Sequence, residues 1–400
     1  MVQKNKYSII VVSIMGMVFA VAASCCHGEP PPSWSVKAVY TRVMASSKAG
    51  SDYDLNRDLF MQQLPGGEPV RLTDWAKHPL LAPYVGGPHW SPNGEHVLFM
   101  GSLKGHTVIM PQNDWPSYPW ILDIQTKKLK LIGPTKDRWY MNVAWLPNQN
   151  EILARVVLGK RPQFYYYGDL QSDEVMSGGE ARLVTINIKT GREKTIIRKL
   201  NPGRFFVFAN DHKLIIYERY NDKLTLYNLG RGKWRTLLRS APLDVAAISP
   251  DGKRFAYYNK GVLRVCNIQT SKVQMLYNAR DVYDRGGKLI WSPNGKWIVL
   301  RHSSGDITSI DPPVASSTSY LTLVDATSGK ARLLLEDSRD FPIGWTRDSM
   351  NIILRHEEKT DDAFPNDTKT VLTAYPISAQ GQPSSVEIVG YQGSIDIAKP

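Results

Sequence analysis

The sequence predicts an all-β protein, a seven-bladed β-propeller whose four-stranded antiparallel blades close into a ring. Three observations predict it. An apolar run, a polar turn and a second apolar run recur along residues 88–390, and a further hairpin-like pair follows each copy. The period of about 40 to 60 residues matches that of propeller blades with insertions. No convincing helical periodicity interrupts this pattern after the first 25 residues.

Each blade is expected to begin with a hairpin, strands A and B, around a turn of fixed chemistry. The clearest turns are Ser-Pro-Asn-Gly at 91–94 and 292–295 and Ser-Pro-Asp-Gly at 249–252. Asn-Gly and Asp-Gly accept the positive φ of a tight turn. A tryptophan recurs late in strand A, where a large ring is expected to fill the space between neighbouring blades. The residues at this position are Trp90, Trp145, Trp291 and Trp345.

The second hairpin of each blade supplies strands C and D, as in "RLVTINIKTGREKTII" and "YLTLVDATSGKARLLL". The chain begins with an incomplete unit, because segments 34–45, 58–64 and 68–74 read as strands B, C and D without a strand A. A spare strand within 393–400 is expected to pair with this unit. That pairing closes the ring and removes two exposed sheet edges.

The repeated segments resemble a known family. "HWSPNGEHVLFM", "ISPDGKRFAYYN" and "WSPNGKWIVLRH" resemble the WD40-like (PD40) repeats of the TolB C-terminal propeller. "DLFMQQLPGGEPVRLT" is similar to a strand pair of the same group, which recurs in propellers of the dipeptidyl peptidase IV N-terminal type. The resemblance covers nearly all of residues 34–400 and implies the fold. The chain lacks the separate α/β domain of TolB and has seven units where TolB has six, so a TolB-type role is not implied.

The N-terminus reads as an export signal. Residues 1–25 combine Lys4 and Lys6, an apolar run and small residues before Cys25, which is the order of a secretory signal. The small residues before Cys25 also resemble a bacterial lipobox, which implies lipidation of that cysteine. An uncleaved membrane anchor stays open as an alternative. Residues 26–34 read as a Pro-rich tether and residues 35–400 as the propeller, expected in the periplasm or tethered to the outer membrane of a Gram-negative-type bacterium.

Composition and motifs limit the classes of partner and of enzyme that the sequence supports. The formal net charge of +12 favours acidic partners, although nucleic acid is not expected for an exported protein. No G-x-S-x-G, HExxH, CxxC, Walker or G-x-G-x-x-G motif is present, and no residues remain for a hydrolase domain after the propeller. Cys266 alternates with apolar residues and is expected in the core. The sequence favours a binding protein without a cofactor over an enzyme.

Two metal sites are nevertheless considered. Alternating oxygen ligands resemble the start of a calcium loop, although Arg57 and Gln63 depart from the pattern at its sixth and twelfth positions. These ligands are Asp52, Asp54, Asn56 and Asp58. The second site is implied by the similarity of this propeller group to oligogalacturonate lyases, which hold a metal near the axis with clustered histidines. Its candidates are His89, His302 and His356, for Mn²⁺ or Ca²⁺, although shared repeat origin also explains the last two.

The long connections predict where a partner binds. The A–B and C–D turns are short, whereas the B–C and D–A connections include long insertions at 104–119, 159–180 and 303–319. All B–C and D–A connections emerge on one face, here called the insertion face, and loops on a rigid scaffold commonly carry binding. Large aromatic and arginine side chains there are candidates for contact. They are Trp115, Arg138, Trp139, Tyr140, Tyr165, Tyr166, Arg204, Arg280 and Arg339.

The function expected from these features is a binding or scaffold protein of the cell envelope, which recognises a protein or an anionic glycan. Two alternatives stay open. One is a metal-assisted polysaccharide lyase of the oligogalacturonate type, and the other is the accessory propeller of a split peptidase. The candidate aromatics also have a purely structural explanation, since they can pack the long loops down. The arginines at 138, 280 and 339 can each pair with an adjacent aspartate.

Overall fold

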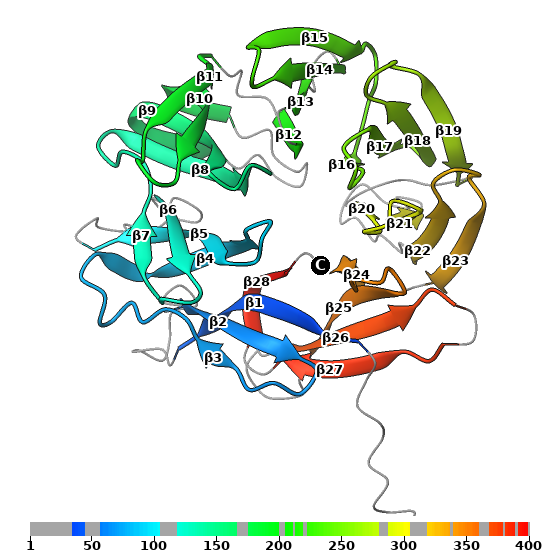
Figure 1. The fold of residues 1–400 in the computed structure, drawn as a ribbon, viewed down its shortest axis with the longest axis horizontal. Coiled ribbons are helices and arrows are strands. Elements are labelled where there is room, and N and C mark those ends of the chain that lie inside the picture. Colours follow the sequence, from blue (N-terminus) through cyan, green and yellow to red (C-terminus); the bar gives the residue numbers. More distant parts are fainter. Residues whose placement is uncertain are drawn as a thin grey trace, which may run out of the picture.

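The computed structural model is a ring of seven four-stranded antiparallel sheets, which confirms the predicted fold class (Figure 1). It describes residues 34–44, 57–104, 118–165, 175–199, 205–210, 213–218, 222–279, 287–304, 318–336, 339–359, 368–378, 381–388 and 391–398. Every regular element in these ranges is a strand. The signal segment 1–25 and Cys25 lie outside them. Among the described residues, no helix is long and apolar enough to cross a membrane.

Strand A of each blade lies nearest the axis and strand D at the rim (Figure 1). Blade 1 contains β28 (Tyr391–Ile397), β1 (Val36–Val43), β2 (Arg57–Leu64) and β3 (Val70–Arg71). Blade 2 contains β4 (Leu81–Trp90), β5 (His96–Leu103), β6 (Tyr118–Asp123) and β7 (Leu129–Leu131). Blade 3 contains β8 (Arg138–Trp145), β9 (Glu151–Tyr165), β10 (Val175–Asn187) and β11 (Glu193–Ile197). Blade 4 contains β12 (Phe205–Asn210), β13 (Lys213–Glu218), β14 (Lys223–Asn228) and β15 (Lys233–Leu238).

The remaining blades follow the same order. Blade 5 contains β16 (Val245–Ile248), β17 (Arg254–Asn259), β18 (Val262–Asn267) and β19 (Val273–Asn278). Blade 6 contains β20 (Lys288–Trp291), β21 (Trp297–Ser304), β22 (Thr318–Asp325) and β23 (Ala331–Glu336). Blade 7 contains β24 (Phe341–Trp345), β25 (Asn351–Lys359), β26 (Thr368–Pro376) and β27 (Ser384–Ile388).

The C-terminal strand closes the ring as predicted. β28 pairs antiparallel with β1, with Ala38 opposite Ile397 and Tyr40 opposite Ile395. Ile397 is 5% exposed and belongs to a core shared by blades 1 and 7. The Asp396 carboxylate accepts a hydrogen bond from the backbone N–H of Trp90 at 2.8 Å, which ties the closing strand to blade 2. One strand therefore joins the first, second and last blades.

The repeated A–B turns form the same set of side-chain hydrogen bonds. Ser91 Oγ donates to Asn93 Oδ1 at 2.7 Å and accepts the backbone N–H of His96 at 2.9 Å. The same bonds recur at Ser292 with Asn294, and at the less regular Thr346 with Asp348. The next residue takes a positive φ, as in Gly94 at 71°. The phrase recurs because the A–B turn needs a hydroxyl at its first position, an Asn or Asp oxygen at its third and a residue that accepts positive φ at its fourth.

Two kinds of contact join neighbouring blades. Near the axis, the strand-A tryptophans fill the seams as expected, and Trp291 Nε1 donates to the carbonyl of Ala247 in the preceding blade at 3.1 Å. At the rim, a strand-D cation binds carbonyls in the C–D turn of the following blade. We call these contacts rim latches. They are Lys130 with Ile188 and Lys189, Arg235 with Ile268 and Gln269, and Arg332 with Ile377.

Gly344 is required by the closing strand. A Cβ added at this position would clash with the Cδ1 and Cγ1 atoms of Ile397. We expect Gly344→Ala to lower the free energy of unfolding by about 1–3 kcal/mol, because overpacking displaces the closing strand. Urea unfolding measures this change. The double variant Gly344→Ala with Ile397→Val should recover part of the loss, and an unchanged unfolding midpoint in the single variant would contradict the packing argument.

Candidate functional site

The described parts of the predicted insertion at 159–180, residues 159–165 and 175–180, are strand. β9 and β10 continue as a two-stranded ribbon, with Tyr165 opposite Val175, beyond the point where β8 ends its pairing at Leu158. The ribbon belongs to a B–C connection and therefore rises from the insertion face. Tyr165 lies within it by its backbone, whereas Tyr166 lies outside the described residues.

Among the described residues, side chains of blades 6 and 7 form one candidate site on the insertion face, near the inner strands of these blades. Phe341, the first residue of β24, is 39% exposed. The guanidinium carbon of Arg301 lies 4.0 Å from the centroid of its ring, and that of Arg355 lies 5.5 Å away. We call these three residues the Arg–Phe–Arg cluster. Arg301 comes from β21 of blade 6, whereas Arg355 is the cross-strand neighbour of Phe341 on β25.

Polar contacts fix this cluster in place. Arg301 Nε donates to the carbonyl of Asp340 at 3.1 Å, and its terminal nitrogen donates to Ser319 Oγ at 3.1 Å. The Asp340 carboxylate lies 3.0 Å from Nδ1 of His356. Side chains of two blades therefore place cationic donors, an aromatic ring and a carboxylate–imidazole pair together. Guanidinium groups bind carboxylates and sulfates by charge-assisted hydrogen bonds, so the arrangement suits an anionic ligand.

Arg138, Trp139 and Tyr140, three of the expected contact residues of blade 3, make contacts within the propeller. Tyr140 is 3% exposed and packs in the core, and its hydroxyl donates to Glu193 Oε1 at 2.7 Å. Burial, followed by the hydrogen bond to Glu193, raises the pKa of Tyr140. Arg138 reaches the same Glu193 carboxylate at 3.3 Å, so its partner is not the adjacent Asp137. Trp139 packs half-buried on the core between blades 3 and 4. Glu193 lies far along the chain from all three, which is why the sequence did not reveal this arrangement.

The three candidate metal-binding histidines lie on three blades. His89 is exposed on β4. His302 is 4% exposed in the seam between blades 5 and 6, where its ring lies near those of Tyr258, Tyr277 and Tyr320. His356 is bonded to Asp340. Within the described ranges, no three His, Cys, Asp or Glu side chains lie close enough to share a metal ion.

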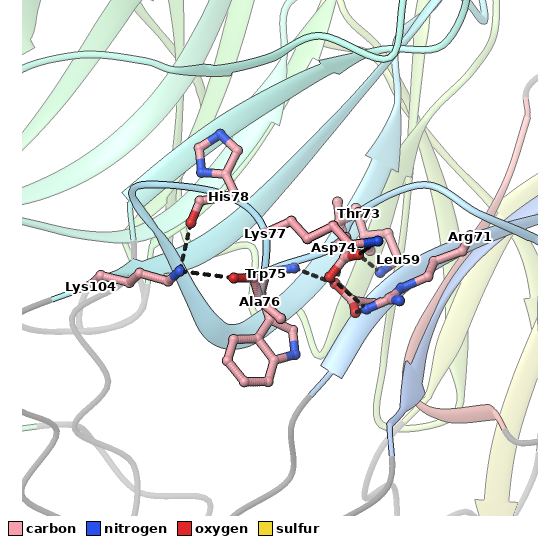
Figure 2. Close-up of polar contacts among 10 residues, drawn as sticks. Leu59, Arg71, Thr73, Asp74, Trp75, Ala76, Lys77, His78 and Lys104 are labelled. Atoms are coloured by element: carbon pink, nitrogen blue, oxygen red, sulfur yellow. Dashed lines mark hydrogen bonds and ion pairs between the residues drawn. The ribbon is translucent and has the colours of Figure 1, made fainter.

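Asp58, the last ligand of the predicted calcium loop, is a fully buried structural carboxylate. It accepts hydrogen bonds from Arg71 at 3.1 Å, from the Thr73 hydroxyl at 2.7 Å and from the backbone N–H of Trp75 at 3.2 Å. Figure 2 labels these three partners. These partners belong to strand D of blade 1 and the connection that follows it. The other three ligands of that loop, Asp52, Asp54 and Asn56, lie outside the described residues.

The remaining residues singled out from the sequence are Arg339, Trp115, Arg204, Arg280 and Cys266. Arg339 is exposed beside Asp340 at the site. Trp115, Arg204 and Arg280 lie outside the described residues. Cys266 is fully buried, and burial raises its thiol pKa to about 11, as suits a core residue. Sequence reasoning missed Arg301, Phe341 and Arg355, although the repeated Leu-Arg-His phrase of blades 6 and 7 contains both arginines.

Comparison with known proteins supports the fold alone. No family model and no curated protein matches the chain. An oligogalacturonate lyase from Vibrio parahaemolyticus is similar, with a TM-score of 0.56 at 15% identity over 82% of this chain and 85% of the lyase. An oligogalacturonate lyase in complex with manganese gives 0.54 at 12% identity over 85% and 91%. TolB from Acinetobacter baumannii gives 0.43 at 13% identity over 74% and 62%. The chain is therefore a seven-bladed β-propeller with a fold similar to that of the oligogalacturonate lyases.

Proposed function

We propose that this chain is an exported binding protein of the cell envelope that recognises an acidic ligand, an anionic glycan or an acidic protein segment, on its insertion face. The Arg–Phe–Arg cluster carries the proposal. Stacking on Phe341 holds both guanidinium groups in place. Arg355, which is half-buried, can contact an anion with little further loss of conformational entropy, whereas Arg301 is 9% exposed and contributes its charge from behind. The formal net charge of +12 favours the same class of partner.

The first test compares one arginine of the cluster with a surface arginine of the same blade. We expect Arg355→Gln to weaken binding of the purified protein to polygalacturonate or polyglutamate about tenfold, since a charge-assisted contact is lost. Arg347→Gln is the matched control, because Arg347 is exposed in the A–B turn on the opposite face. Binding should also fall with added salt. Equal affinities of the two variants, measured by calorimetry, would exclude the cluster as the site.

The nature of the ligand is resolved by the same assay. Preference for polygalacturonate indicates a glycan, and preference for polyglutamate indicates an acidic protein. Shortening the ribbon within 161–180 tests whether it contributes, because an envelope partner that needs it is then lost from pull-downs. The lyase alternative requires that polygalacturonate is cleaved when a divalent metal is supplied, so chain length before and after incubation separates binding from catalysis.

The export part of the proposal is tested separately. Cleavage directly before Cys25 with lipidation of that cysteine predicts a mature chain that starts at Cys25 with an acyl modification, as read by mass spectrometry. A Cys25→Ser variant should then lose the acyl modification. A chain that retains residues 1–25 in the membrane indicates the signal-anchor alternative, and an unprocessed chain outside the membrane contradicts export.

A further inference from the structure

A second concave site lies on the opposite face of the ring. A cavity of about 400 Å³ opens between the outer parts of blades 6 and 7, lined by Trp297, Leu323, Lys330, Ala331, Arg332 and Ile377. Trp297 directly follows an A–B turn, whereas Lys330 and Ile377 belong to C–D turns. The cavity therefore opens on the face of the short turns. It is separate from the Arg–Phe–Arg cluster and does not depend on the function proposed for that cluster.

Strand register explains how blade 6 builds one wall. Trp297 is paired with Asp325, and Leu323 is paired with Arg332. Because alternate residues of a strand point to the same side, Trp297, Leu323 and Arg332 lie on the side of the sheet that faces blade 7. Ile377 of blade 7 forms the opposite wall. Its carbonyl accepts the rim latch from Arg332, which connects the two walls.

The seam between blades 6 and 7 is more open at the rim than the seam between blades 4 and 5. Between blades 4 and 5, Arg235 makes the equivalent latch to Ile268, and Ile268 is only 2% exposed. At blades 6 and 7 the same latch forms, yet Ile377 and Trp297 stay partly exposed around the cavity. The latch therefore holds the blades together without closing the rim.

The lining has the composition of a site for an anionic amphiphile. Trp297, Leu323 and Ile377 supply apolar walls, whereas Lys330 and Arg332 are cations and no lining residue is acidic. Lys296 adds a third cation, with its Nζ 5.1 Å from the centroid of the Trp297 ring. The nearby carboxylate of Asp325 is bonded within its own turn, where Oδ1 accepts from Thr327 and Ser328. Small-molecule sites of roughly 300–1,000 Å³ typically combine apolar walls with a few placed polar groups.

We propose that this rim cavity binds a medium-chain fatty acid. The alkyl chain packs against Trp297, Leu323 and Ile377, and the carboxylate lies at Lys330, with the charge of Arg332 behind it. The apolar walls supply affinity by burying the chain, whereas the cations select a carboxylate over an uncharged head group.

Calorimetric titration of the full chain with decanoate tests this assignment. We expect saturable binding that Lys330→Glu weakens about tenfold or more, since attraction for the carboxylate becomes repulsion. Lys272→Glu is the matched control, because Lys272 occupies the same position of the C–D hairpin in blade 5, and it should leave affinity unchanged. Decanol, which has the chain without the charge, should bind more weakly than decanoate.

A second variant tests the apolar part. Ile377→Trp adds bulk within the cavity and is expected to abolish decanoate binding, with thermal unfolding showing that the variant is folded. The proposal is overturned if the unmodified protein shows no saturable binding of decanoate, or if the two lysine variants bind equally. Tight binding of decanol would exclude Lys330 as the head-group contact.

Discussion

Asp58→Ala should lower the free energy of unfolding by about 3 kcal/mol, because a fully buried carboxylate is removed from its partners. Thr73 and the backbone N–H of Trp75 lose their acceptor, and Arg71 loses its buried counter-charge. Thr73 also accepts the backbone N–H of Leu59 at 2.9 Å, so the loss extends to the pairing of strands C and D. Urea unfolding of the purified chain measures the change.

Two further variants make this prediction specific. Asp58→Asn keeps an acceptor for Thr73 and Trp75 but loses the charge, so a smaller loss of about 1–2 kcal/mol is expected. Asp74→Asn is the matched control, because Asp74 also contacts Arg71, at 3.1 Å, from a more exposed position. The control should unfold at the same urea concentration as the unmodified protein. If neither Asp58→Ala nor Asp58→Asn changes the free energy of unfolding, the buried carboxylate has no structural role.

Acidification should destabilise the propeller through His302. Burial lowers the pKa of this imidazole from 6.5 to about 4. The unfolded chain therefore binds a proton in a pH range where the folded chain does not. The contribution of His302 to stability is complete above about pH 6.5 and is lost as the pH falls to about 4, with a total of about 3 kcal/mol. The structural reason is a ring enclosed by tyrosines, whose Nδ1 has no hydrogen-bond partner among the described residues.

Urea unfolding at a series of pH values tests the linkage. His302→Gln removes the titrating group and preserves a donor for Thr322, which lies 3.1 Å from Nε2 of the histidine. Its stability should fall less than that of the unmodified protein between pH 6.5 and 4. His96→Gln, at a partly exposed position beside Asp123, leaves His302 in place and should keep the full slope. Parallel profiles for the unmodified protein and His302→Gln would assign the acid sensitivity to other groups.

The fold was predictable because its determinants are local. The A–B turn is specified by a few adjacent residues, such as Ser91 to Gly94, and the repeat of that phrase reveals the blade period. The closing strand was predictable because the first unit lacked a strand A and a spare strand followed the last unit. The inner strand of blade 2 was less predictable. It starts at Leu81, before residue 88 where the predicted repeats begin, because irregular pairing between Leu81 and His89 interrupts the alternation of apolar and polar residues.

The candidate site was less predictable because contacts between blades decide it. His302 and His356 share one repeat position, yet the first packs against tyrosines and the second binds Asp340. Arg301 and Phe341 meet across a seam, so no local pattern signals their stacking. Glu193, far along the chain, likewise binds both Arg138 and Tyr140, which no local pattern signals.

The pairing of β28 with β1 also bears on how the protein is made. Because β28, the innermost strand of the first blade, follows every other described strand of the ring in chain order, the ring cannot close until β28 has left the ribosome. A product that terminates early would present the free backbone of β1 as a template for other extended chains. Only chains that extend through β28 therefore cover the inner edge of β1 and close the ring.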